Sequence, residues 1–157
     1  MQRPEFSAAY LHPRYWMTWL GLGLLWLIVQ LPYRAILWVG RAIGCVLYWV
    51  AGSRRHIAQR NLELCFPRLS QAERKALLRE NFASTGIALL EMAMSWWWPE
   101  KRLQKLVTIE GLEHLQAAQA NKQGVILMAL HFTTLEIGAA LLGQLHTIDG
   151  MYRAYKN

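Results

Sequence analysis

The expected fold follows from one stretch of sequence, Val125-Ile126-Leu127-Met128-Ala129-Leu130-His131-Phe132-Thr133-Thr134-Leu135-Glu136. Its first six residues form a short apolar run, which is typical of a buried β-strand. We expect a helix to begin at Thr133 or Thr134 and to continue to about Leu145. His131 then ends the strand, and Glu136 lies in the first turn of the helix. Because open α/β sheets bind ligands at this end of their strands, both residues are candidate site residues.

The segments around this stretch predict an alternation of strands and helices. Residues 107–110 and 150–153 have the composition of strands, and a helix is predicted over residues 112–121. Gly111 and Gly124 separate these elements. Strands that alternate with helices indicate an α/β fold with a largely parallel sheet.

The predicted chemistry of His131 and Glu136 is proton transfer. A neutral histidine can remove the proton from an acceptor hydroxyl, while the glutamate holds the tautomer and stabilises the imidazolium. Inside one helix, five positions would separate the two side chains by about 140°, so this hypothesis requires a break between them. The alternatives are a structural histidine and a glutamate favoured only by the helix macrodipole.

The sequence gives little support for a metal site, a redox site or a covalent nucleophile. The spacing of five between His131 and Glu136 is not that of a zinc-binding helix, and no third ligand is apparent. Cys45 and Cys65 form no C-x-x-C motif and have no histidine at zinc spacing. The cysteine spacing therefore predicts neither a metal nor a redox role. No serine or cysteine is placed as a nucleophile, so no covalent intermediate is predicted.

A membrane anchor is predicted near the amino terminus. Residues 15–33 contain no charged side chain over 19 positions. A helix needs about 20 apolar residues to cross the hydrocarbon core, so a transmembrane helix is expected here. The following segment carries more basic residues than the preceding one, which places the rest of the chain in the cytoplasm. The alternatives are a cleaved signal peptide and a buried core helix.

Residues 34–51 differ from this stretch because they combine apolar residues with arginines. Arg34 and Arg41 are seven positions apart and share one helix face. This pattern predicts an interfacial helix with its arginines on lipid phosphates. The alternative is a second span that closes a hairpin. Residues 1–52 therefore form the predicted membrane anchor.

The middle of the chain contains a predicted basic linker and a long helix. The linker begins at residues 54–56, and Pro67 ends any helix before it. Ser70 and Glu73 have the spacing of a capping box, which opens a helix that runs to about Ser95. Residues 96–98 are a tryptophan triplet, which we interpret as a loop dipping into a membrane, a wall of an acyl-chain pocket, or a packed corner.

The overall charge narrows the choice of partners. The net charge is +7, from 17 basic and 10 acidic residues. Such a balance suits a bilayer surface, a phosphorylated lipid, an acidic carrier protein or a nucleic acid. The basic residues cluster beside the predicted membrane segment and form no recognisable nucleic-acid motif, so nucleic acid is not an expected partner.

Several separated stretches together resemble the late acyltransferases of lipid A biosynthesis, the lauroyl/myristoyl group of Gram-negative bacteria. The matching stretches cover nearly the whole chain in order: His12-Pro13-Arg14-Tyr15-Trp16, Arg60-Asn61-Leu62-Glu63-Leu64-Cys65-Phe66-Pro67, Glu91 and the tryptophan-rich turn to Pro99, residues 131–136, and Tyr152-Arg153.

The resemblance implies an inner-membrane enzyme of lipopolysaccharide biosynthesis whose active site faces the cytoplasm. Such enzymes transfer an acyl chain from acyl-carrier protein to a hydroxyl of a Kdo-bearing lipid A precursor. His131 and Glu136 match the catalytic pair of the family, and Arg153 is expected to bind an anionic group of the substrate. No cofactor is expected.

The length of the chain bears on whether it is an active enzyme by itself. Members of this family continue past the position of Asn157. We therefore expect residues 53–157 to be the amino-terminal part of a glycerolipid-acyltransferase-like α/β domain, and the chain to be a truncated, poorly active form. The alternatives are a related membrane acyltransferase acting on another glycolipid or on glycerophosphate, and a non-catalytic membrane-bound fragment. The stretch at residues 60–67 argues against glycerophosphate.

Overall fold

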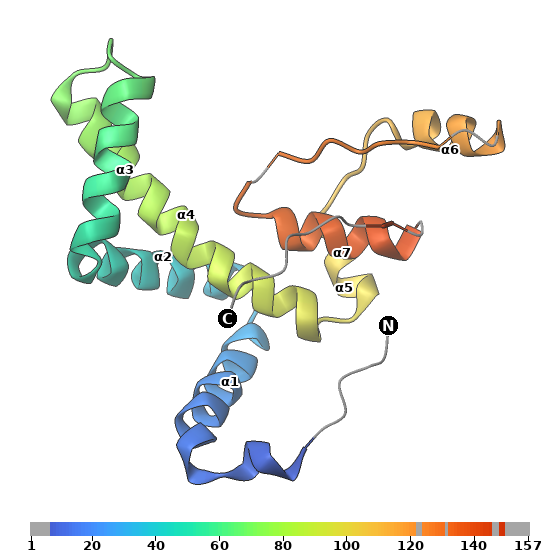
Figure 1. Ribbon diagram of the computed structural model, residues 1–157, viewed down its shortest axis with the longest axis horizontal. Helices are drawn as coiled ribbons and strands as arrows, with labels where there is room; N and C mark the ends of the chain where they lie inside the picture. Colours follow the sequence, from blue (N-terminus) through green and yellow to red (C-terminus); the bar gives the residue numbers. More distant parts are fainter. Residues whose placement is uncertain (1–6, 122–123, 131, 146–147, 150–157) are drawn as a thin grey trace. The chain divides into compact units, whose positions relative to one another are not determined.

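The computed structural model describes residues 7–121, 124–130, 132–145 and 148–149. The chain divides into two compact units, Met1–Ala93 and Met94–Asn157. Figure 1 shows the helices, whose order is η1 (Ala8–Leu11), η2 (Pro13–Tyr15), α1 (Trp16–Val29), α2 (Tyr33–Val50), α3 (Gly52–Cys65), α4 (Gln71–Trp97), α5 (Glu100–Gln104), α6 (Leu112–Ala120) and α7 (Leu135–Leu145).

The predicted α/β fold is wrong, because all regular elements among the described residues are helices. Residues 107–110 and 124–130, two of the predicted strands, have no regular secondary structure. A strand forms only when a second strand satisfies its backbone groups, and no described segment pairs with either stretch. The apolar run is also exposed, with Ile126 97% and Met128 91% accessible. The third predicted strand, residues 150–153, lies outside the described residues.

The predicted transmembrane helix over residues 15–33 is also wrong. Helix α1 has 14 residues, which is short of the roughly 20 that a span requires. The chain turns after Val29, and Pro32 caps the next helix. Within the described ranges, no single helix is both long and apolar enough to cross a membrane. Helices α2 and α3 pass a test of length and composition together, but the chain bends by 95° between them.

The long helix α4 begins as its sequence predicts. The Glu73 carboxylate accepts hydrogen bonds from the Ser70 backbone N–H and hydroxyl, both at 2.7 Å, and the Ser70 hydroxyl accepts one from the Glu73 N–H at 3.3 Å. The capping box is therefore confirmed. The predicted linker before it is wrong, because residues 54–56 belong to α3. That helix ends at Cys65, two residues before Pro67, as expected.

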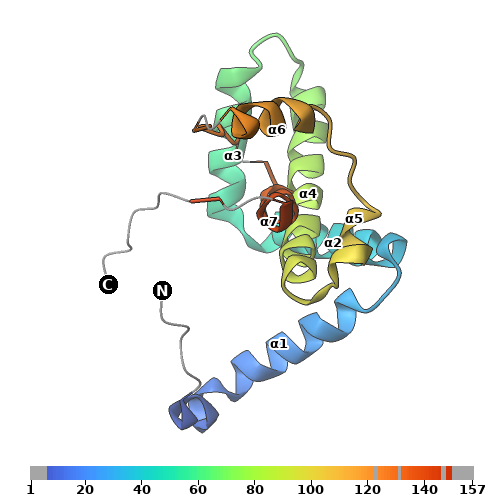
Figure 2. The same ribbon diagram turned by 90° about the vertical axis from the view of Figure 1, so that its right-hand side faces the viewer.

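Glycines let α2 and α4 approach each other closely within the first unit. A Cβ atom on Gly86 would lie 2.1 Å from the Gly40 carbonyl oxygen, and one on Gly44 would lie 2.3 Å from the Phe82 carbonyl oxygen. Any side chain here would therefore overlap the backbone of the facing helix. The crossing is visible in Figures 1 and 2. The apolar core of this unit consists of Val29, Ile36, Leu78, Phe82, Leu90 and Ala93.

The second unit has a smaller core, formed by the end of α4 with α5 and α7. Its buried apolar residues are Met94, Trp98, Leu103, Ile137 and Leu141. Helix α6 begins after Gly111, which has a φ of 79°. Glycine tolerates this left-handed conformation without a steric penalty. The predicted helices over residues 112–121 and 133–145 are confirmed to within two residues.

Candidate functional site

Glu136 lies in the first turn of α7, as predicted. The helix begins at Leu135, and the Gly138 N–H donates to the Thr134 carbonyl oxygen at 3.2 Å. Residues 132–134 are not helical, so the chain changes direction between the positions of the two candidate residues. This break is the condition that the proton-transfer hypothesis requires. The Glu136 side chain is exposed and therefore accessible to a partner.

The other two predicted site residues are His131 and Arg153. His131 and Arg153 both lie outside the described residues. The pairing of His131 with Glu136 and the contact of Arg153 with an anionic group therefore stay predictions.

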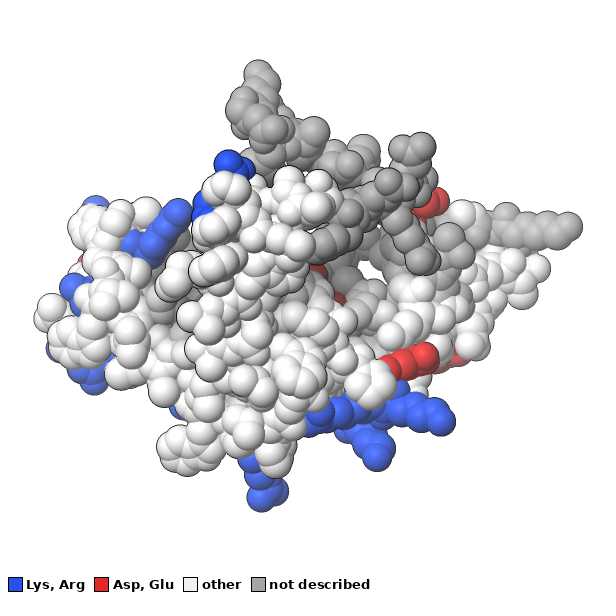
Figure 3. Space-filling view, turned by 90° about the horizontal axis from the view of Figure 1, so that it is seen from below, with Lys and Arg blue, Asp and Glu red and all other residues white. Residues whose placement is uncertain are grey.

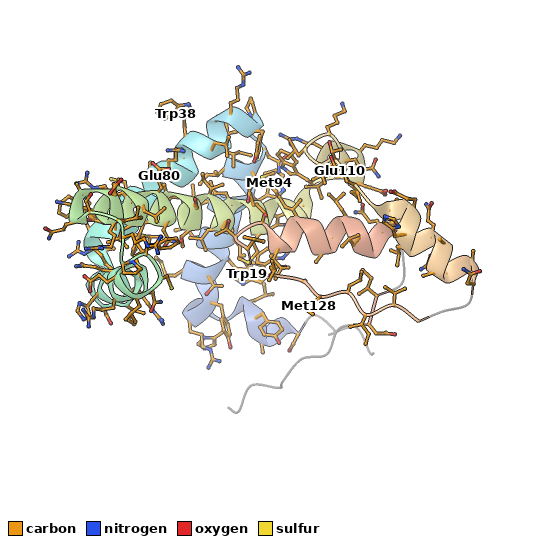
Figure 4. All side chains as sticks on the ribbon, turned by 90° about the horizontal axis from the view of Figure 1, so that it is seen from above. Trp19, Trp38, Glu80, Met94, Glu110 and Met128 are labelled. Atoms are coloured by element: carbon orange, nitrogen blue, oxygen red, sulfur yellow. The ribbon has the colours of Figure 1, made fainter. Side chains whose placement is uncertain are left out.

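Helix α7 is fixed by its apolar face. Ile137 and Leu141 are buried one turn apart, and Glu136 projects from a different side of the helix. Helix α7 packs against α5, and Met94 of α4, labelled in Figure 4, is fully buried. The packed face thus sets the direction in which the first turn presents its carboxylate.

The three tryptophans of residues 96–98 differ in how far they are buried. Trp98 is buried, and the Arg102 guanidinium carbon lies 3.5 Å from its ring centroid. Trp97 contacts the Trp96 ring edge to face at 5.7 Å, while Trp96 itself is 55% exposed. Trp98 therefore forms a packed corner, which was one of the three interpretations. The exposed ring of Trp96 is accessible, so its contact with lipid stays a prediction.

A buried polar pair in the first unit was missed by sequence reasoning. The Tyr33 hydroxyl donates to the Glu91 carboxylate at 3.0 Å and joins the start of α2 to α4. Glu91 is only 5% exposed. In the sequence, Glu91 is one of the positions that carry the family resemblance. The signal was present, because this glutamate interrupts the apolar run of residues 87–94 and must be satisfied when buried.

Burial changes the titration of both members of this pair. Desolvation raises the pKa of Glu91 above its usual value of 4.5, although the Tyr33 hydrogen bond acts in the opposite direction. Burial, together with the charge of Glu91, raises the pKa of Tyr33 to about 12. A phenol that stays protonated remains a donor throughout the neutral range, which suits a structural tie between two helices.

The cysteines and acidic residues offer little for metal binding. In the part of the chain that the structure describes, no three His, Cys, Asp or Glu side chains are grouped so that they could hold a metal ion. Cys45 and Cys65 are free and exposed.

Comparisons with known proteins identify related sequences over nearly the whole chain. The lipid A biosynthesis lauroyltransferase of Escherichia coli strain K12 is 46% identical over 154 residues, which are 98% of this chain and 50% of that protein. The palmitoleoyltransferase of the same strain is 44% identical over 153 residues, with the same coverage of both chains. Its myristoyltransferase is 35% identical over 140 residues, 88% of this chain and 43% of that protein.

The extent of the match is as informative as its strength. The chain spans about half the length of the curated relatives it matches. No solved structure matches it significantly. The family model described as bacterial lipid A biosynthesis acyltransferase matches residues 3–157. A match over nearly all of the sequence is decisive, and the chain belongs to the bacterial lipid A biosynthesis acyltransferase family.

Proposed function

We propose that the protein containing this chain transfers a fatty acyl group to a hydroxyl of a Kdo-bearing lipid A precursor, with acyl-carrier protein as the donor. The family match over residues 3–157 is the observation that carries this proposal. The relatives named for lauroyl, palmitoleoyl and myristoyl transfer support an acyl substrate. The net charge of +7 suits both an anionic lipid and an acidic carrier protein.

In the proposed mechanism, His131 is the general base. It accepts the proton of the acceptor hydroxyl as the oxygen attacks the thioester carbonyl carbon, and the carbon–sulfur bond then breaks. The departing thiolate takes the proton back from the imidazolium. Glu136 orients the imidazole and stabilises its charge, and its position in the first turn of α7 supports this role. Arg153 binds an anionic group of the substrate.

We further propose that the protein is attached to the inner membrane, with its active site on the cytoplasmic side. Helix α1 exposes much apolar surface, including Trp16 at 64% and Met17 at 77%. Figure 3 shows a broad area without charged side chains on one face of the molecule. Helix α2 is the interfacial helix of this proposal, because exposed arginines and tryptophans share its outer side. Exposed apolar areas of this kind mark protein or membrane contacts.

Complementation tests the proposed reaction. The protein is expressed at its natural length in a bacterial strain that lacks its lauroyltransferase, and the mass of lipid A is measured. We expect one acyl chain to be restored. Turnover of purified protein is then compared between acyl-carrier protein thioester and acyl-coenzyme A. A preference for acyl-coenzyme A would overturn the proposed donor. Formation of acylated glycerophosphate instead of acylated lipid A would overturn the proposed acceptor.

Two variants with a matched control test the mechanism. His131→Ala should reduce the turnover number by about 1,000-fold, as general-base catalysis contributes roughly 10² to 10⁴. Glu136→Gln should also reduce it, whereas Glu113→Gln should not. Glu113 is the appropriate control because it occupies the first turn of α6 as Glu136 does in α7, and it is likewise exposed. Equal effects of the two glutamine variants would show that Glu136 acts only on helix stability.

A further inference from the structure

A basic groove lies between α2 and α4, and none of the residues proposed for catalysis lines it. It has a volume of about 420 Å³ and belongs entirely to the first unit. The glycine-mediated crossing of the two helices brings its walls together. Its lining residues are Arg41, Cys45, Tyr48 and Trp49 from α2, and Arg79, Glu80 and Ala83 from α4.

The charges in the groove leave one arginine uncompensated. Arg41 forms an ion pair with Glu80 at 3.4 Å, and both side chains are more than half exposed. Exposed pairs of this kind contribute little to stability, so an incoming anion can compete for Arg41. Arg79 lies over the Tyr48 ring, whose centroid is 5.9 Å from the guanidinium carbon. Among the described residues Arg79 has no acidic partner, and its N–H donors are available.

Tyr48 lines the groove, and its ring contacts neighbouring side chains. It packs edge to face against Phe82 at 5.6 Å, and Phe82 is buried in the core. Arg55 donates to the Tyr48 carbonyl oxygen at 2.8 Å, and its guanidinium carbon lies 5.1 Å from the centroid of the same ring. The Arg79 guanidinium lies over this ring, and its planar fork of donors suits a tetrahedral oxyanion such as phosphate.

Exposed apolar side chains adjoin these arginines on the same helix. Trp49 lines the groove and is 68% exposed, and Trp38 is 77% exposed. Figure 4 shows Trp38 pointing outward from α2, while Glu80 lies on α4. A helical spacing of 100° per residue puts Trp38, Arg41, Cys45 and Trp49 on one side of α2. Tryptophans beside cations are typical of a protein surface at the lipid headgroup level.

We propose that this groove binds the phosphate of an anionic glycerophospholipid in the bilayer, with Arg41 and Arg79 on the phosphate oxygens and Trp49 against the glycerol and upper acyl chain. Phosphate matches the bidentate geometry of guanidinium groups. The apolar wall explains why the occupant is a lipid rather than free phosphate. The inference rests on the proposed membrane association of α2, but it does not depend on acyl transfer.

Vesicle flotation of the purified protein tests this inference. The probes are vesicles of phosphatidylcholine alone and vesicles that also contain phosphatidylglycerol. We expect the double variant Arg41→Gln/Arg79→Gln to bind the phosphatidylglycerol vesicles at least about tenfold more weakly than the unchanged protein. The control Arg54→Gln/Arg68→Gln removes the same charge from exposed arginines outside the groove, and its loss should stay below about threefold.

A gain of binding provides a check that misfolding cannot imitate. Glu80→Gln removes the anion that competes for Arg41, so it should strengthen binding to phosphatidylglycerol vesicles. Adding inorganic phosphate should leave vesicle binding of the unchanged protein intact; displacement by free phosphate would overturn the lipid assignment. Equal losses in the two double variants would show that only overall charge matters, and would overturn the groove.

The same experiment separates this inference from the proposals on which it depends. Failure of the unchanged protein to bind either kind of vesicle would overturn the membrane association and the groove together. Binding to both kinds with equal affinity would preserve the association and overturn the groove. Acyl transfer, measured separately with soluble donor and detergent-dispersed acceptor, should be retained by the groove variants, because no proposed catalytic residue is altered.

Discussion

Two apolar stretches of this chain, one in each unit, differ sharply in burial. In the unit Met1–Ala93, Leu90 is fully buried, and even the carboxylate of Glu91 is enclosed and hydrogen bonded. In the unit Met94–Asn157, the apolar residues 125–130 are exposed, and no described segment pairs with them. The difference shows that apolar composition alone does not determine burial. Helices satisfy their own backbone, whereas an extended segment depends on a partner.

Truncating a buried leucine and an exposed isoleucine gives the sharpest contrast between the units. Leu90→Ala should reduce the free energy of unfolding by about 3 kcal/mol, because removal of buried methyl groups leaves a cavity. Ile126→Ala, at a residue 97% exposed, should change it by less than about 0.5 kcal/mol. Urea unfolding followed by circular dichroism measures both. A large loss from Ile126→Ala would mean that residues 125–130 are packed in solution, and would remove the contrast.

The sequence predicts structure correctly where neighbouring residues alone determine it. The capping box of Ser70 and Glu73 predicted the start of α4, and Gly111 correctly separated α6 from the preceding segment. Residues 125–130 were misassigned because an apolar run reports only a tendency to be buried. Whether such a run becomes a strand depends on residues far away in the sequence. Helix α1 was overestimated because the uncharged stretch continues past the turn at Pro32.

The candidate site was predictable in part for the same reason. The position of Glu136 in a first turn depends on local sequence and is confirmed. Its relation to His131 and Arg153 is non-local and stays a prediction. The Tyr33–Glu91 pair joins residues 58 positions apart, and composition cannot reveal which tyrosine satisfies which carboxylate.

Substituting a glycine at the helix crossing tests the packing of the first unit. Gly86→Ala should destabilise the protein by about 2 kcal/mol, because its Cβ atom would overlap the Gly40 carbonyl oxygen at 2.1 Å. The matched control is Gly23→Ala in α1, where no atom lies within 4 Å of the added Cβ. Alanine there should stabilise the protein by up to about 1 kcal/mol through helix propensity. Thermal unfolding of both variants should therefore shift in opposite directions; a parallel shift would contradict the close crossing.

Removing the Tyr33 hydroxyl tests the buried polar pair. Tyr33→Phe should destabilise the protein by about 2 kcal/mol near neutral pH, because the buried carboxylate of Glu91 loses its donor. Because the pKa of Glu91 is raised in the folded state, protonation of this carboxyl group stabilises the fold. This contribution is fully present at pH values below the usual pKa of 4.5, and it is lost as the pH rises through the folded-state pKa. The Tyr33 hydrogen bond lowers that pKa, so its loss should move the decline to higher pH.

The pH dependence of unfolding between about pH 4 and pH 8 distinguishes this effect from a simple loss of packing. Glu91→Gln removes the titrating group, so this component of the pH dependence should disappear in that variant. It should also disappear in the double variant Tyr33→Phe/Glu91→Gln. A decline that persists without Glu91 would assign the pH dependence to another group.

The smallest expected effect concerns the cap of α4, which is local to one helix end. Ser70→Ala should cost about 1 kcal/mol, because the Glu73 N–H and carboxylate both lose the hydroxyl of residue 70. Ser53→Ala, at an exposed serine within the first turn of α3, is the control and should change stability by less than about 0.5 kcal/mol. The pKa of Glu73, which hydrogen bonds from Ser70 hold below its usual value, should rise in the Ser70 variant. Nuclear magnetic resonance titration of that carboxyl group would detect the change, and an unaltered pKa would mean that the capping box is not formed in solution.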